Sequence, residues 1–96
     1  MKKIKLMPEF ECYPTWIFLN DSIFEPVDFE TLPLSAQLKN QLRRWDAAYQ
    51  AIYDRANPTN SGFKNSANEI EFDAEEKRIL NALQSELTDY DVVYYK

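Results

Sequence analysis

The chain lacks histidine and has only one glycine and one cysteine among its 96 residues. Without histidine there is no Ser-His-Asp or Cys-His nucleophilic pair, no imidazole metal ligand and no histidine general base. A single glycine excludes the glycine-rich loops that cradle phosphates, and a single cysteine excludes zinc clusters and Cys-x-x-Cys redox pairs. The sequence therefore favours a protein that binds a partner and is not an enzyme, although a paired-carboxylate hydrolase remains an alternative.

The compartment is indicated by the lone Cys12, which cannot form an internal disulfide and so favours a reducing environment. No run of about 18 apolar residues is present that could span a membrane. Pro8, Glu9 and Glu11 stand where the apolar part of a signal peptide would follow the N-terminal lysines. We therefore expect a cytoplasmic protein without membrane contact. Cys12 itself has no cation near it in sequence, which favours a small buried residue at a strand end over a reactive thiol.

The composition predicts a single domain over residues 1–96, because 45% of the residues are hydrophobic and 15% aromatic. The net charge is −5, and three of the eleven cations lie in the first five residues, so the rest has eight cations against sixteen acids, a net of −8. This balance favours a basic protein partner over nucleic acid or an anionic membrane. Acidity that only keeps a small protein soluble is the alternative.

Two strands are predicted in the first third of the chain. Apolar residues alternate over residues 1–7 and again over 15–19, where Trp16 and Phe18 would share one face. Residues 20–33 are acidic, contain two prolines and are expected to be irregular. Four apolar side chains should attach this segment to the core: Ile23, Phe24, Val27 and Phe29.

Two helices and a final strand are predicted in the remainder. Ser35 is the expected N-cap of the first helix, which should end before Asn57-Pro58. Its apolar stripe is Leu38, Leu42, Trp45, Tyr49 and Ile52. Residues 57–62 are turn formers, and Ser66 with Glu69 fits a capping box for a second helix to about residue 87. The stripe of that helix is Phe72, Ile79, Leu80, Leu83 and Leu87.

The last six residues, 91–96, read as a β-branched and aromatic strand. The order is then β-β-α-α-β, and each helix must bury one stripe. We predict an α+β two-layer sandwich, with a small sheet that has both helices on one face. The final strand could accept a partner strand if it lies at a sheet edge, and an ordinary core strand is the alternative.

Acids crowd the start of the second helix. The helix dipole accounts for acids in the first turn only. At about 100° per residue, Glu69 and Glu76 fall on the side of the apolar stripe, which is costly unless they are paired or exposed. Glu76 could pair with Arg43 or Arg44 of the first helix. We expect the acids as a group to form a partner-binding patch. It would lie at the end of the helix that overhangs the sheet, beside exposed aromatic rings. Its members are Phe63, Glu69, Glu71, Phe72, Asp73, Glu75 and Glu76.

A divalent cation is the alternative ligand for this carboxylate row. However, Glu69, Asp73 and Glu76 would come from one helix face, whereas cation sites usually wrap the ion with a loop. We therefore expect no metal and no cofactor.

Several segments of the chain resemble a group of small bacterial proteins. They are Met-Lys-Lys-Ile-Lys-Leu-Met-Pro at residues 1–8 with Cys12, Pro14 and Trp16; Leu32-Pro33-Leu34-Ser35 before a helix bearing Trp45 and Tyr49; Asn57-Pro58-x-x-Ser61-Gly62-Phe63; and Tyr90-x-Val92-x-Tyr94. This group comprises immunity proteins of contact-dependent growth inhibition and related polymorphic toxin systems. The resemblance spans nearly the whole chain. Two departures are Glu11, where the group tends to have glycine, and Ala56-Asn57, where it tends to have an acidic pair.

The resemblance implies a cytosolic inhibitor that binds the C-terminal toxin domain of a large exoprotein. Many such toxins are nucleases, often tRNases, so the implied partner is a basic protein. We expect the inhibitor alone to be a monomer. A non-catalytic adaptor or regulatory subunit of another bacterial complex is the alternative. The adjacent open reading frame would distinguish the two, since a toxin gene there favours the immunity protein and a metabolic or ribosomal operon favours the adaptor.

Overall fold

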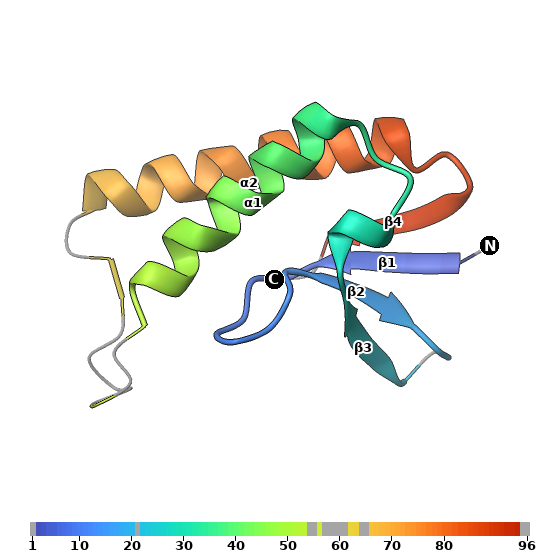
Figure 1. Cartoon of the computed structure of the whole chain (residues 1–96), viewed down its shortest axis with the longest axis horizontal. Coiled ribbons are helices and arrows are strands. Elements are labelled where there is room, and N and C mark those ends of the chain that lie inside the picture. Colours follow the sequence, from blue (N-terminus) through green and yellow to red (C-terminus); the bar gives the residue numbers. More distant parts are fainter. Residues whose placement is uncertain (1, 21, 54–55, 57–61, 64–65, 95–96) are drawn as a thin grey trace.

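The fold is a four-stranded sheet covered on one face by two helices (Figure 1). The computed structural model describes residues 2–20, 22–53, 56, 62–63 and 66–94. In chain order the elements are β1 (Lys2–Leu6), β2 (Thr15–Phe18), β3 (Phe24–Val27), the 3-10 helix η1 (Phe29–Thr31), α1 (Ala36–Ala51), α2 (Ser66–Glu86) and β4 (Tyr90–Tyr94). The predicted α+β two-layer sandwich is confirmed, with one strand more than expected.

The sheet has the order β3-β2-β1-β4. β1 pairs antiparallel with β2 and parallel with β4, so that Ile4 lies beside both Ile17 and Val92. These three side chains pack toward the helices, because Ile4 belongs to the core and the other two lie against it. β4 is thus an edge strand, as the partner-strand interpretation requires. The expected strand residues 1, 95 and 96 lie outside the described residues.

β3 is the strand that the sequence did not predict. It lies in the segment expected to be irregular, and its central Pro26 faces Trp16 across the pair. Phe29 is buried and Val27 packs on the core, as predicted. Ile23 and Phe24 do not, since 54% and 38% of their surfaces are exposed. The prediction failed for these two because the β2–β3 hairpin extends away from the helices, as Figure 1 shows.

α1 begins at the predicted cap, where the Ser35 hydroxyl accepts a hydrogen bond from the Leu38 N–H at 3.1 Å. Its stripe faces the core, with Leu38, Leu42 and Trp45 buried. The Glu86 carboxylate accepts hydrogen bonds from the Ser35 backbone N–H and hydroxyl, so the end of α2 is tied to the start of α1. α1 ends at Ala51, earlier than expected, and the predicted turn at 57–61 lies outside the described residues.

The far ends of the two helices extend beyond the ends of the strands (Figure 1). This confirms the expected overhang of α2. Six aromatic rings pack together there and form what we call the aromatic cluster: Phe10, Trp45, Tyr49, Tyr53, Phe63 and Phe72. Phe10 belongs to the β1–β2 loop, which Gln50 of α1 holds by accepting from the Glu11 N–H and donating to the Glu9 carbonyl, both at 2.8 Å. The overhang therefore has a small core of its own.

The helix-free face of the sheet buries a lysine. Lys5 has no exposed surface, and its ammonium lies 3.3 Å from the ring centroid of Phe24 and 5.5 Å from that of Trp16. Such rings attract a cation, but burial removes its hydration. Desolvation by burial lowers the pKa of Lys5. The charged form is thus less favoured in the folded chain than in water.

Lys5→Met should remove one component of the pH dependence of stability. Because the folded pKa of Lys5 lies below the unfolded value of 10.5, the unfolded chain binds more protons between these two values. Wild-type stability therefore gains a component as the pH rises through that window, and the variant does not. Urea unfolding of both proteins from neutral pH upward measures the difference. Parallel plots of unfolding free energy against pH for the two proteins would contradict the assignment. The titration of the tyrosines does not affect the comparison, because both proteins contain the same tyrosines.

Candidate functional site

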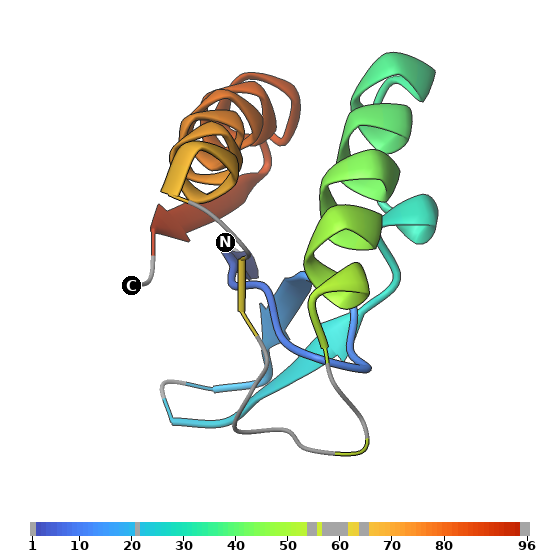
Figure 2. The same ribbon diagram turned by 90° about the vertical axis from the view of Figure 1, so that its left-hand side faces the viewer.

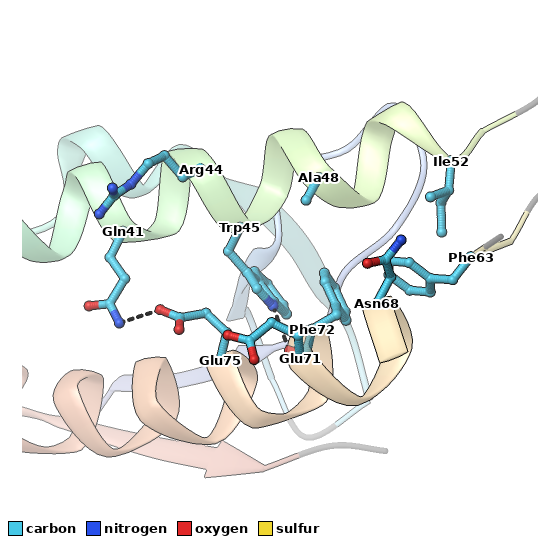
Figure 3. A pocket seen from close by; sticks show the side chains of 10 residues that line it. All are labelled: Gln41, Arg44, Trp45, Ala48, Ile52, Phe63, Asn68, Glu71, Phe72 and Glu75. Atoms are coloured by element: carbon cyan, nitrogen blue, oxygen red, sulfur yellow. Dashed lines mark hydrogen bonds between the residues drawn. The ribbon is translucent and has the colours of Figure 1, made fainter. Parts of the chain in front are cut away.

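A groove of about 520 Å³ lies between the second half of α1 and the first half of α2. Figure 3 shows Trp45 and Phe72 side by side in it, with Gln41 and Arg44 on the α1 side and Glu71 and Glu75 on the α2 side. The two helices lie next to each other above the sheet (Figure 2), and no described strand lies beneath their overhanging ends (Figure 1). Of the predicted site residues, it brings together Phe63, Glu71, Phe72 and Glu75.

Aromatic rings line the groove. Trp45 and Phe72 stack with centroids 4.7 Å apart and an interplanar angle of 12°, and the Trp45 indole N–H donates to the Phe72 carbonyl at 3.2 Å. Phe63 is half-buried against Phe72, with centroids 5.1 Å apart. Phe72 itself is only 8% exposed, so the expectation of an exposed ring is wrong. The reason is that α1, not the sheet, covers this part of α2.

The acidic wall of the groove is held in place by polar partners. Glu75 accepts hydrogen bonds from Gln41 across the groove and from Arg78 on its own helix, the latter at 2.6 Å. Arg78 also pairs with Glu71 at 3.3 Å. The bonds from Gln41 and Arg78, followed by the positive charges of Arg78 and Arg44, lower the pKa of Glu75. Glu75 is therefore a fixed carboxylate and the opposite of a general acid, which needs a raised pKa.

The other predicted acids lie on a different side of α2. At about 100° per residue, Glu69, Asp73 and Glu76 lie roughly 100–160° around the helix from Glu71 and Glu75. They lie on the side of the apolar stripe, away from the groove, and Figure 2 shows β4 beneath this helix. The predicted acidic patch is thus divided into two surfaces, one in the groove and one away from it. We call Glu69, Asp73 and Glu76 the outer acids.

Glu76 is buried within the apolar stripe, with 7% of its surface exposed. The expected pairing with Arg43 or Arg44 is absent from the described residues. Arg43 instead forms a bidentate ion pair with Glu30, its Nη2 lying 2.8 and 3.0 Å from the two carboxylate oxygens. The pairing fails because Arg43 points away from α2, on the outer side of α1. No buried side-chain nitrogen or oxygen in the described part of the chain lacks a hydrogen-bond partner.

No metal site is formed by the described residues, since they contain no group of three or more histidine, cysteine or acidic side chains placed to hold an ion. Cys12 is half-buried in the β1–β2 loop and not at a strand end. Among the described residues, no helix is both long and apolar enough to cross a membrane.

An acidic α+β domain with an aromatic groove has features of a small protein-binding module. The chain belongs to the Serratia CdiI immunity protein-like family, whose family model matches residues 2–96. The search of curated proteins gave no significant match. The family match confirms the resemblance found in the sequence. The protein is an immunity protein of a contact-dependent growth inhibition system, and family membership implies that it inhibits a cognate toxin by binding it.

Proposed function

We propose that the protein acts in the cytoplasm, as a monomer, and neutralises a basic nuclease toxin domain such as a tRNase. The charge of α2 supports this proposal most directly. From Ser66 to Glu76 the helix carries five acids and no cation. A nuclease must present cations to phosphate groups, so its substrate cleft matches such a helix in charge.

The toxin would contact the first half of α2. Half-buried Phe63 supplies an apolar surface at the groove, beside the buried ring of Phe72, and Glu71 and Glu75 lie at its rim. The outer acids continue the negative charge around the helix. An inhibitor with this arrangement can flank a basic cleft and attract it over a distance, which speeds association.

Co-expression tests this function. Cells that express the toxin domain encoded beside this gene should stop growing, and growth should recover when the immunity protein is produced as well. A non-cognate immunity protein serves as the control for dosage. Undiminished toxicity would contradict the proposal, and a rescued toxin that degrades no RNA or DNA in the absence of its inhibitor would contradict the nuclease assignment.

A further inference from the structure

The two edges of the sheet differ in their capacity to accept another strand. β3 has Pro26 at its centre, and proline on an edge strand discourages pairing because it lacks an N–H and is bulky. β4, Tyr90–Tyr94, contains no proline, and none of the described residues pairs with its outer side. Natural proteins usually block such an edge. An unblocked edge opposite a blocked one is therefore a candidate docking surface.

α2 lies above β4 and contacts it. The two run in opposite directions, so that β4 returns beneath the second half of the helix (Figure 1). Five strand residues span about 17 Å, the length of roughly eleven helical residues. Counted back from Glu86, the C-terminal end of β4 is thus approximately level with Glu76. The outer acids therefore lie above and beyond that end of the strand.

The charges on the side of α2 next to β4 indicate which kind of strand could pair with the free edge of β4. On this side of α2 the described ionisable residues are the three outer acids and Lys77, and exposed Asp89 and Asp91 begin the β4 segment. A second copy of the chain, paired edge to edge, would bring two acidic sides together, and like charges oppose that contact. A strand with cations at one end would meet complementary charge instead.

We propose that the free edge of β4 accepts a strand of the toxin, with cationic residues flanking that strand where it passes the end of β4 below Asp73 and Glu76. Backbone hydrogen bonds to β4 supply affinity, and the outer acids orient the strand. The proposal rests on the proposed function only in assigning the strand to the toxin.

Proline substitution at the adjacent positions Val92 and Val93 tests the edge. In a strand, neighbouring N–H groups point to opposite sides, so one of the two variants loses a bond to β1 and the other loses an outward N–H. The first should unfold more readily, and the second should keep its melting temperature. The folded variant should bind the toxin at least about tenfold more weakly, since one hydrogen bond of about 1.4 kcal/mol is lost. Threonine at the same position is the matched control, because it keeps the N–H and the branched shape.

Amide hydrogen exchange provides a second measurement on the wild-type protein. The outward N–H groups of β4 should become protected when the toxin binds, while those of β3 stay unchanged. Normal affinity of the folded proline variant, or β4 amides that remain unprotected in the complex, would overturn strand addition and leave toxin neutralisation intact. Protection that appears without toxin, together with a dimer in sedimentation, would assign the edge to a second copy. Failure of the wild type to bind the toxin would overturn the proposed function itself.

Discussion

Replacing Phe72 with alanine is expected to lower the free energy of unfolding by about 3–5 kcal/mol. The ring is 8% exposed and contacts Trp45, Tyr49 and Phe63 at centroid distances of 4.7, 5.6 and 5.1 Å. It therefore joins both helices and the segment that precedes α2. No strand lies beneath the overhang to replace these contacts (Figure 1). Its loss leaves a cavity that the neighbouring rings cannot close without moving.

Thermal unfolding measures this effect. A domain of this size loses about 4–8 °C of melting temperature per kcal/mol, so the midpoint should fall by roughly 12 °C or more. Ile70→Ala on the same helix is the control, because Ile70 is 68% exposed and should change stability by no more than about 0.5 kcal/mol. Similar losses in both variants would show that helix propensity, and not the aromatic cluster, determines the stability of the overhang.

The periodic parts of the fold were predictable from sequence. The stripe of α1 and its Ser35 cap were confirmed, because a long helix with one apolar face has few ways to pack. β3 was not predictable, because Glu25 and Pro26 are unfavourable in a strand. The segment becomes a strand only through its pairing with β2, which the local sequence does not indicate. Glu11 adopts φ of 60°, a conformation that favours glycine, and the apolar periodicity of the sequence does not indicate it.

The candidate site was predicted as a segment but not as a surface. The sequence placed the acids on the first half of α2, yet it could not give the rotation of that helix against α1. This rotation assigns Glu71 and Glu75 to the groove and separates them from the outer acids. Gln41 and Arg44 were missed as groove residues. The available signal was their position beside the stripe residues Leu42 and Trp45, on a helix expected to lie next to α2.

Reversing Glu69 and Asp73 to lysine is expected to slow association with the toxin by about tenfold or more at low ionic strength. Both residues belong to the outer acids, whereas Glu75 lies in the groove and is bonded to Gln41 and Arg78. Glu76 is left unchanged because it is buried, and a lysine there would disturb the stripe. The dissociation rate should change less than the association rate, since long-range attraction acts before contact.

Stopped-flow or surface-based kinetics over a range of salt concentrations separate steering from a general charge effect. Salt screens attraction between exposed charges, so the wild-type association rate should fall steeply with salt and that of the double variant should be nearly flat. Single Glu69→Lys and Glu25→Lys variants change the net charge equally, but Glu25 lies on β3, on the far edge of the sheet. If steering depends on the outer acids, only the Glu69 variant slows markedly. Equal slowing would mean that net charge alone attracts the toxin, and unchanged rates in both would remove the outer acids from the binding surface.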